Sequence, residues 1–512
     1  MASLFLQELL TSTLVLSVLI SLYIRSKQRS NSPLLPIDWP IFGILPAIVF
    51  NLRNFHEFLT FLLSTSRHNY KARIASIRFF LTCDPVNVRH ILTSNHANYL
   101  KGPEFPEIFD VMRGTFFTTD GESWRQQRAK IQSILSSPHI LSLTAKCCLH
   151  KIEQGLVPFL IRMARTSTPF DMNDVISRFA FDMTAMPIFS VDPDQLSSHM
   201  PCVDVSIAMD TVMEVAFYRH IVPASCWKLM RRIKVGPECK IVTAHMVLRG
   251  FIAEMVERSK IGHVDGQKQE ADGHVDILSH YLNDPYYKDQ DLLRAKLITY
   301  MVAGRDTIST TLPWVLYNLA RNPHVLSVIR NELTPIASSK TTYSTCSKGT
   351  IVIFNTDETK ALVYLHAALL ETLRLYPPIP LERKTVASSD VMPSGHEVHE
   401  GEIIIISLYA MARMKDIWGE DCLEFRPERW LSEDGGKLRY VPSNKFLAFN
   451  SGPRMCLGKD IAIMEMKTVM ATIVWNFDLE MLQAGPAVEQ KTSVLLQMKN
   501  GLMVKVKERD VY

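Results

Sequence analysis

The segment FNSGPRMCLGKD, at residues 449–460, constrains this chain most because it holds two glycines, an arginine and a cysteine at fixed spacing. A phosphate-binding loop would need four residues between its glycines and a hydroxyl residue after the lysine. Here five residues separate Gly452 from Gly458, and Asp460 follows Lys459. The extra residue changes the ring of backbone amides, and the carboxylate would face the phosphates. The phosphate-loop interpretation therefore fails.

The cysteine of this segment suits a thiolate ligand for a metal. Cys456 comes just before the helical stretch KDIAIMEMKTVMATIVW, whose N-terminal amides and dipole favour an anionic sulfur. Gly452 permits a sharp bend, Gly458 permits close approach of a flat cofactor, and Phe449 can shield the sulfur from water. Arg454 offers a fork of N–H groups to a carboxylate. An inert buried cysteine is the alternative, but these five positions arise by chance only on the order of 10⁻⁵ to 10⁻⁴ times per chain.

Helical periodicity dominates the rest of the sequence, for example over residues 291–323 and 358–378. Strand-like segments are fewer and occur at 401–410, near 73–82, and at the C-terminus, where 499–501 (Lys-Asn-Gly) indicates a hairpin turn. The sequence therefore predicts a mainly α fold with a small β component.

Composition limits the functions open to the chain. Of its 512 residues 47% are hydrophobic, with 24 Phe and 23 Met, which is enough for a large apolar core and an apolar pocket. The net charge is +4 and the basic residues are dispersed, so nucleic acid is not an expected partner. The nine cysteines are odd in number and irregularly spaced, which favours free thiols in a reducing compartment.

The N-terminus predicts a membrane anchor. Residues 1–24 are largely apolar, approach the ~20 residues of a spanning helix, and are followed by Arg25, Lys27 and Arg29. Basic residues after the span keep the following chain in the cytoplasm, whereas a cleaved signal peptide would carry them before it. We expect an anchor at 1–24, a basic and proline-rich hinge at 25–48, and one catalytic domain at 49–512.

Two helical motifs are weak when taken alone. In Ala303-Gly304-Arg305-Asp306-Thr307, the glycine and threonine are poor helix formers in the middle of a long helix, although a packing notch in a core helix is the better explanation when the motif stands alone. Glu371 and Arg374 have the spacing of a local ion pair, which is usually a solvated surface pair. Their value comes from their combination with FRPERW at 425–430 and with Cys456.

Together these motifs resemble those of the cytochrome P450 superfamily, and the resemblance covers essentially the whole chain. It implies the cytochrome P450 fold and haem b, with Cys456 as the axial ligand of the iron. It also implies a haem-binding loop around Phe449, Gly452 and Gly458, and a structural cluster of Glu371, Arg374 and Arg429 that is needed for haem incorporation.

The resemblance assigns further residues to haem and oxygen chemistry. Trp124 and Arg128, in ESWRQQR, bind one haem propionate, and Arg454 serves the other charged side of the ring. Arg383, in PLERK, is a further candidate propionate ligand, although a surface arginine is the common case. Asp306 and Thr307 form the acid and alcohol pair that relays protons to bound dioxygen.

The implied activity is that of a monooxygenase, which inserts one oxygen atom into an apolar substrate with electrons from NADPH through a membrane-bound NADPH–cytochrome P450 reductase. The expected location is the endoplasmic reticulum membrane, with a single span and a cytosolic catalytic domain. The motifs AGRDT, FNSGPRMCLGKD and MARMKDIWGEDCLEFRPERW are similar to those of the plant fatty-acid and alkane hydroxylases. Four phenylalanines suit an apolar guest, or equally ordinary core packing: Phe105, Phe109, Phe116 and Phe117.

Three alternatives stay open at this point. Relatives in the same plant branch couple two phenols in alkaloid biosynthesis, and an acidic or hydrogen-bonding residue in the pocket would favour that reaction over alkane hydroxylation. Haem-thiolate isomerases or dehydratases of lipid hydroperoxides usually lack the acid and alcohol pair, and a non-catalytic haem-binding or scaffold protein would not need it. Two departures also bear on the substrate: a short stretch between FLTFLL and TCDP predicts a trimmed N-terminal sheet, and Pro313 predicts a kink in the long helix.

Overall fold

The computed structural model describes residues 35–197, 200–201, 204–264, 276–282, 289–341, 351–482 and 488–509. The predicted anchor at 1–24 and the first part of the hinge lie outside these residues. Within the described ranges, no helix is both long and apolar enough to cross a bilayer.

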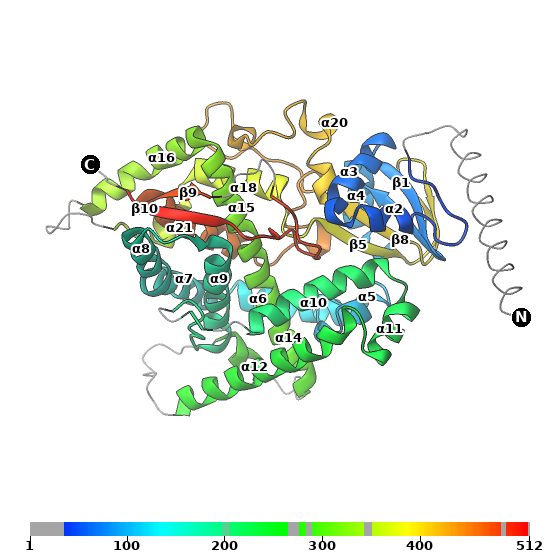
Figure 1. Cartoon of the computed structure of the whole chain (residues 1–512), viewed down its shortest axis with the longest axis horizontal. Helices are drawn as coiled ribbons and strands as arrows, with labels where there is room; N and C mark the ends of the chain where they lie inside the picture. The colour runs from blue at the N-terminus through cyan, green and yellow to red at the C-terminus, as the bar shows by residue number, and fades with distance from the viewer. Residues whose placement is uncertain are drawn as a thin grey trace, which may run out of the picture.

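Helices make up most of the described chain (Figure 1). The α-helices are α2 (Leu45–Phe50), α3 (Phe55–Thr65), α4 (Pro85–Arg89), α5 (Phe105–Ile108), α6 (Gly121–Leu135), α7 (Pro138–Lys151), α8 (Val157–Thr166), α9 (Met172–Phe189), α10 (Asp204–Ile221), α11 (Ala224–Ile233), α12 (Glu238–Val264), α13 (Ile277–Leu282), α14 (Gln290–Met301), α15 (Thr307–Arg321), α16 (Pro323–Thr341), α17 (Thr356–Lys360), α18 (Val363–Leu375), α19 (Leu408–Met411), α20 (Lys415–Trp418) and α21 (Lys459–Asn476). Short π and 3-10 segments include η2 (His90–Ser94), η4 (Asp110–Met112), η5 (Ile152–Leu156), η8 (Val302–Asp306), η9 (Pro427–Trp430) and η10 (Gly452–Arg454).

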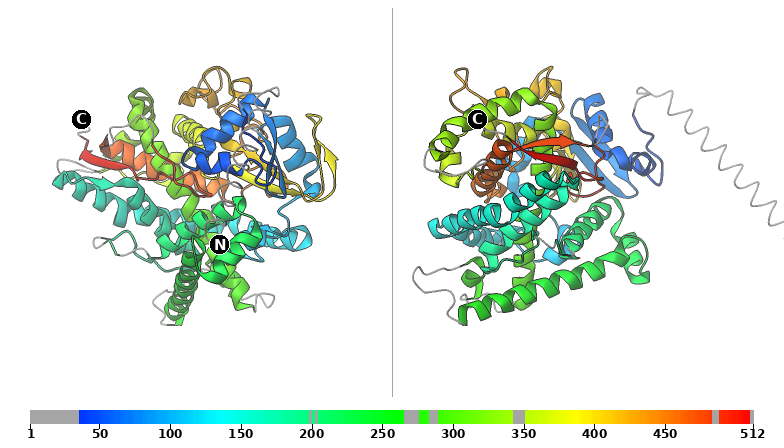
Figure 2. Two further views of the ribbon diagram at one scale, coloured as in Figure 1. Left: turned by 45° about the vertical axis from the view of Figure 1, so that its right-hand side comes forward. Right: turned by 60° about the vertical axis from the view of Figure 1, so that its left-hand side comes forward.

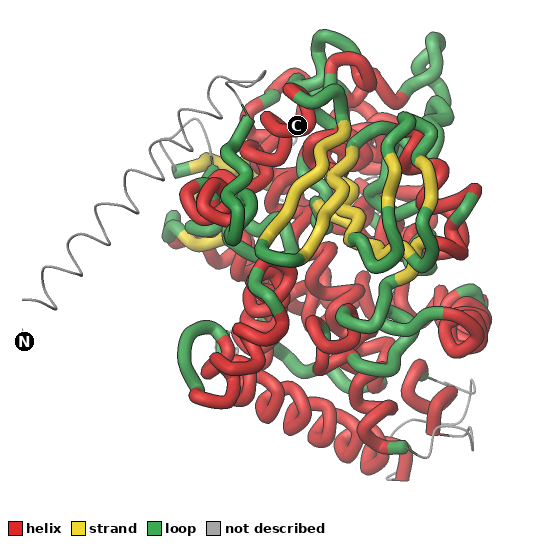
Figure 3. The backbone as a smooth tube through the Cα atoms, turned by 90° about the vertical axis from the view of Figure 1, so that its right-hand side faces the viewer, coloured by secondary structure: helices red, strands yellow, loops and turns green. Residues whose placement is uncertain are grey.

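The strands form small sheets, and the largest of them lies at one side of the helical body (Figure 3). They are β1 (Asn69–Ile74), β2 (Ile77–Thr82), β3 (Tyr99–Leu100), β4 (Phe170–Asp171), β5 (Leu381–Val386), β6 (Asp390–Val391), β7 (Glu397–Val398), β8 (Ile403–Ser407), β9 (Phe477–Met481) and β10 (Met503–Glu508). The largest sheet has the order β1-β2-β8-β5-β3, in which β2 and β8 run parallel and the other pairs antiparallel. The predicted fold class, mainly α with a small β component, is confirmed.

The large sheet keeps both of its N-terminal strands despite the short sequence in this region. β1 and β2 are six residues each and pair along their whole length, from Asn69 opposite Thr82 to Ile74 opposite Ile77. Ala75 turns the chain between them with a positive φ of 51°. The sequence shortening therefore leaves the sheet with a tight turn and intact strands.

The predicted C-terminal hairpin is wrong in its pairing. β10 pairs antiparallel with β9 on one side and with β4 on the other, while the segment before the turn makes an isolated bridge between Gln490 and Met498. Asp171, in β4, accepts a hydrogen bond from the amide of Leu502 at 2.8 Å. This contact and the ladder to β9 decide the partner of β10, and neither is encoded in the local turn sequence.

Proline-rich segments favour extended backbone, but the described part of the hinge is folded against β1. Trp39 and Gly43 form a β-bridge, and Arg73 donates to the carbonyl oxygens of Trp39 at 2.7 Å and Pro40 at 2.9 Å. Gly43 has a φ of +62°, and a Cβ there would lie 1.8 Å from the carbonyl oxygen of Arg73. Only glycine permits this close approach of two backbone segments.

The described residues form two apolar cores. The larger core joins the main sheet to α9, α15, α18 and α21. The second core lies under α5, α10, α12 and α14, and Figure 2 shows α12 running along one edge of the molecule beneath α10. The helical segment α14-η8-α15 contributes side chains to both cores.

That segment departs from α geometry at the AGRDT motif. Residues 302–306 form the π-helix η8, and α15 then continues through Pro313 to Arg321. Pro313 predicted a kink in the long helix. The change from α-helical to π-helical hydrogen bonding lies upstream of it, in η8. A π segment of this kind shifts the register of the following helix and often marks a functional site.

Candidate active site

The cysteine loop is shaped by close backbone contacts. Gly452 has a φ of +66°, and a Cβ at this position would lie 2.0 Å from the carbonyl oxygen of Leu92 in η2. The amide of Cys456 donates to the carbonyl oxygen of Phe449 at 2.8 Å, which closes the loop. Gly452 and the backbone of Phe449 therefore help to place Cys456 before α21.

The thiol of Cys456 is open on one side and enclosed by protein on the other. This enclosure raises the pKa of the Cys456 thiol, whereas a hydrogen bond from the Gly458 amide and the nearby charge of Arg128 lower it. The amide and the guanidinium would stabilise a thiolate once the sulfur binds a metal ion.

The loop brings together three of the predicted propionate ligands. Arg454 and Arg128 lie 4.5 Å and 5.9 Å from the Trp124 ring centroid. Arg128 donates to the carbonyl oxygen of Met455 at 2.7 Å, and Arg454 donates to Asp120 Oδ1 at 2.5 Å. Residues from α6 and from the cysteine loop, more than 300 positions apart, thus form one cationic cluster beside Cys456.

Asp120 is a member of this cluster that the sequence reasoning missed. It precedes α6 in the position of a helix cap, but its carboxylate accepts hydrogen bonds from the amides of Lys101 and Gly102, each at 3.0 Å. Asp120 therefore fixes the chain after β3 against the arginine cluster. A capping residue is the ordinary interpretation of an aspartate in this place, so the sequence carried no signal for the tertiary contact.

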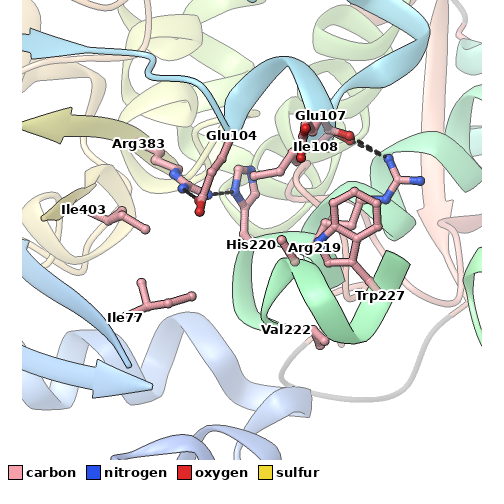
Figure 4. A pocket seen from close by; sticks show the side chains of 11 residues that line it. Ile77, Glu104, Glu107, Ile108, Arg219, His220, Val222, Trp227, Arg383 and Ile403 are labelled. Carbon is pink, nitrogen blue, oxygen red and sulfur yellow. Dashed lines mark hydrogen bonds and ion pairs between the residues drawn. The ribbon is translucent and has the colours of Figure 1, made fainter. Parts of the chain in front are cut away.

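Arg383 lies apart from that cluster. It donates to Glu104 Oε2 at 2.6 Å and lies 3.1 Å from Nδ1 of His220, as Figure 4 shows. Its neighbours in β5 contact different partners, since Glu382 Oε1 lies 3.0 Å from Lys101 Nζ and 2.9 Å from Lys384 Nζ.

Side chains alternate along a strand, so the register of β5 decides whether Arg383 or Lys384 points toward the cationic cluster. Burial lowers the pKa of Lys101 to about 8, and the nearby charge of Arg454 contributes to this shift. Lys101 and Lys384 are thus cationic groups near the cluster that the sequence reasoning missed.

The π-helix η8 places the AGRDT side chains on two faces. Ala303 is the exposed residue of the stretch 292–320, and Thr307 donates from Oγ1 to its carbonyl oxygen at 2.8 Å. Gly304 faces α9, where a Cβ would lie 2.6 Å from Cγ2 of Thr184. Gly304 is therefore a packing notch, as the simpler interpretation had it, while Ala303 and Thr307 line an opening in an otherwise buried helix.

Asp306 lies on the buried face and makes no hydrogen bond to Thr307. Its Oδ1 accepts from Arg305 Nη1 at 2.7 Å, and the same Nη1 lies 2.7 Å from Asp210 Oδ1 on α10. Its Oδ2 has no partner among the described residues. Burial raises the pKa of Asp306 to about 6 against the opposing effect of Arg305, so the carboxyl can carry a proton near neutral pH.

Glu371, Arg374 and Arg429 meet in the core beneath the site. Arg374 forms two hydrogen bonds with Glu371, at 2.8 Å and 2.9 Å, and Arg429 Nε lies 3.3 Å from Glu371 Oε1. Trp430, which the sequence reasoning did not single out, donates to Glu371 Oε2 at 2.9 Å. Every polar group of the fully buried Glu371 is satisfied, as a buried charge requires.

An apolar cavity of about 140 Å³ lies between the main sheet, α5 and α10. Its aromatic walls are Phe55, Phe79, Phe105, Phe109, Phe117 and Phe217. Its polar lining includes Lys101, Glu382, Arg383 and His220. The cavity adjoins the cationic cluster, because Phe117 precedes Thr119, whose carbonyl oxygen accepts from Arg454 at 2.9 Å.

These features fit a haem group. A thiol supported by an amide donor suits the iron, Arg128 and Arg454 suit the propionates, and the unpartnered Oδ2 of Asp306 suits a site that handles protons. Comparison with known families agrees, because the profile of the family described as Cytochrome P450 matches residues 33–506.

The chain belongs to the cytochrome P450 family.

Individual relatives extend over nearly the full length. This P450 is 38% identical to noroxomaritidine synthase 1 of Narcissus pseudonarcissus, over 95% of this chain and 94% of the relative. It is 35% identical to alkane hydroxylase MAH1 of Arabidopsis thaliana, with 96% and 97% covered, and 33% identical to cytochrome P450 86B1 of the same plant, with 97% and 90% covered.

These similarities establish a P450 monooxygenase, an oxidoreductase of the haem-thiolate type. The family generally uses a redox partner and a hydrophobic substrate. The names of the relatives describe different reactions, so the substrate has to be argued from the cavity.

Proposed function

We propose that this P450 binds haem b through Cys456 and hydroxylates a long-chain aliphatic molecule, an alkane or a fatty acid, in plant wax or lipid metabolism. Electrons would come from NADPH through NADPH–cytochrome P450 reductase. When bound, the haem supplies the activation of dioxygen, and its thiolate ligand favours cleavage of the O–O bond.

The haem-holding roles follow the contacts around the loop. The Gly458 amide and the charge of Arg128 support the thiolate of Cys456. Arg128 and Arg454 would bind the propionates, with Trp124 packed against both guanidinium groups. Glu371, Arg374 and Arg429 hold the core beneath the loop and take no part in the reaction.

Proton delivery would fall to Asp306 and Thr307. The Thr307 hydroxyl donates to the Ala303 carbonyl, so its oxygen can accept a proton-bearing partner on the open face of the helix. Asp306 exchanges a proton near neutral pH because burial raises its pKa to about 6. Since its carboxyl lies on the other face, the relay needs a rotation of Asp306 away from Arg305 or a chain of water molecules.

The single observation that carries the choice of substrate is the lining of the cavity. Its walls are mainly aliphatic and aromatic. The carboxylate in its lining, Glu382, forms ion pairs with the ammonium groups of Lys101 and Lys384. These two cations lower the pKa of Glu382 to about 2 despite its burial. An apolar chain fits such a cavity, whereas a protonated amine would find no available carboxylate.

Membrane attachment is part of the same proposal. We infer an anchor at 1–24, a hinge at 25–48 and a catalytic domain at 49–512, in the endoplasmic reticulum membrane with the domain in the cytosol. Large apolar side chains exposed on α2, α11 and the loop before α2 support it: Phe42, Val49, Phe50, Leu229 and Ile233. α2 and α11 lie at the same end of the molecule (Figure 1).

Oxidative phenol coupling is the second candidate. The noroxomaritidine synthases at 38% identity support it, and the six aromatic rings of the cavity would stack on a phenol. A haem-thiolate isomerase or dehydratase of lipid hydroperoxides is a third, and the presence of both Asp306 and Thr307 argues against it.

Two measurements test the proposal. The reduced protein with carbon monoxide should show the red-shifted absorption of thiolate-bound haem, and Cys456→Ala should abolish both that band and turnover. Optical spin-state titrations should then show a response to a long-chain alkane or fatty acid. A response only to a phenolic amine would replace the aliphatic substrate with phenol coupling, and a Cys456→Ala variant that still turns over would overturn the whole account.

A further inference from the structure

His220 stands out in the cavity because it is a polar ring among phenylalanines. It lies near the end of α10, with ring centroids 5.7 Å from Phe109 and 6.2 Å from Phe105. Arg383 reaches it from β5, and Glu104 holds that arginine from the start of α5 (Figure 4). Three separate elements therefore fix the position of one imidazole.

The contact with Arg383 determines which ring nitrogen carries the proton. A guanidinium can only donate hydrogen bonds, so Nδ1 of His220, at 3.1 Å from Nη1, must accept. Burial, followed by the charges of Arg383 and Lys101, lowers the pKa of His220 well below its ordinary value, and Glu382 opposes this shift only weakly. The ring is therefore neutral, and its single proton is on Nε2.

Nε2–H is left as a hydrogen-bond donor. No residue in the described part of the chain accepts from it, and the ring lines the cavity. The ammonium of Lys101 pairs with Glu382 at 3.0 Å and the terminal nitrogen of Arg383 with Glu104 at 2.6 Å, although Nε of Arg383 is buried without a partner among the described residues. The half-buried ring presents this donor among largely apolar walls, so a ligand that supplies an oxygen acceptor here is favoured over one that does not.

We propose that His220 determines substrate specificity by donating a hydrogen bond from Nε2 to an oxygen atom on an otherwise apolar substrate. The oxygen belongs to a carboxylate, a hydroxyl, a carbonyl or a phenol. This inference rests on the proposed function and narrows it, because an oxygen-bearing chain then binds better than the unsubstituted alkane of the same length. An ammonium group is not recognised at this position, since Nε2–H cannot accept a hydrogen bond.

The test uses two substitutions that separate the ring nitrogens. Asn at this position can keep an acceptor for Arg383 but does not reach the place of Nε2, whereas Gln can place an amide N–H near Nε2. Binding to the haem-loaded full chain is measured by calorimetry and by spin-state titration. The ligands are a long-chain alkane, the alcohol and the carboxylic acid of the same length, and a simple phenol.

We expect His220→Asn to weaken binding of the oxygenated ligands by about tenfold, the effect of one hydrogen bond to a neutral or charged acceptor, and to change alkane binding by less than about twofold. His220→Gln should restore most of the loss. The response of acid, alcohol and phenol identifies which oxygen the site prefers.

The proposal is overturned if wild-type protein binds the alkane as well as its alcohol and acid, or if His220→Asn weakens all ligands equally. Calorimetry reports binding without reference to the iron. Failure of the proposed function, seen as a missing thiolate-haem band or absent product, is therefore distinguishable from failure of the role of His220.

Discussion

Opposing effects set the pKa of Asp306, and substitution of one neighbouring residue can separate them. Its burial and the nearby carboxylate of Asp210 favour the protonated form, whereas Arg305 favours the ionised form. Arg305 lies between the two carboxylates, at 2.7 Å from each. The protonation state of Asp306 is thus linked to a residue on α10, the helix that also carries His220.

Asp306→Asn should lower turnover by about 10²-fold, as expected for loss of a general acid, with little change in substrate binding. In the wild type, turnover limited by proton delivery should rise as pH falls toward about 6, because the protonated fraction grows about tenfold per pH unit. The variant should lose this dependence. Product formation measured across pH checks it.

Asp210→Asn serves as the control for this prediction. This substitution removes the Asp210 charge, which raises the pKa of Asp306, and Arg305 then pairs with Asp306 only. The pKa of Asp306 should therefore fall, and the rise in turnover should move to lower pH. An Asp306→Asn enzyme with the wild-type pH profile would contradict the proton-delivery role.

At the scale of elements, the contact between η8 and α9 depends on the absence of one side chain. Gly304→Ala would place a Cβ 2.6 Å from Cγ2 and 2.9 Å from Oγ1 of Thr184. We expect this overpacking to destabilise the protein by about 1–3 kcal/mol. Thr184→Ala should recover part of that loss in the double variant, a coupling that a double-mutant cycle from urea unfolding measures.

The same substitution in α12 gives the matched control. Gly250 is exposed, and a Cβ there would meet nothing within 4 Å. Gly250→Ala should therefore stabilise the protein by about 0.5–1 kcal/mol through helix propensity alone. If both substitutions destabilise to the same extent, the effect at Gly304 does not come from its contact with Thr184.

Across the whole molecule, local patterns predicted the elements and tertiary pairing decided the contacts. Helical periodicity was sufficient for the fold class, whereas the gathering of Trp124, Arg128 and Arg454 was predicted from the resemblance of their motifs to the cytochrome P450 superfamily. The strand partner of β10 and the orientation of Arg383 depend on register, which a one-residue shift reverses. His220 carried no sequence signal, because its role arises only where α10 meets β5.

The stability of the whole molecule should depend on pH through Glu465 in α21. This side chain is 5% exposed, has no hydrogen-bond or ion-pair partner among the described residues, and burial raises its pKa to about 8. The native state therefore retains a proton between about pH 4.5 and 8 that the unfolded chain releases, so stability falls as pH rises through this window, by about 1.4 kcal/mol per pH unit. Buried His56 and half-buried His366 act oppositely, because lowered pKa values of about 3 and about 4 reduce stability as pH falls below about 6.5.

Glu465→Gln, which is neutral at every pH, should remove the decline on the alkaline side. We expect a gain of about 3–4 kcal/mol near pH 7.5 and less than about 1 kcal/mol near pH 5, where the unfolded chain has only begun to release the proton that the native state keeps. Urea unfolding of the haem-bound protein at the two pH values measures the difference. Glu480→Gln, at an exposed position in β9, should change stability by less than about 0.5 kcal/mol at either pH. An equal gain for Glu465→Gln at both pH values would assign the effect to packing, because proton linkage requires the gain to grow as the unfolded chain loses the proton that the native state keeps.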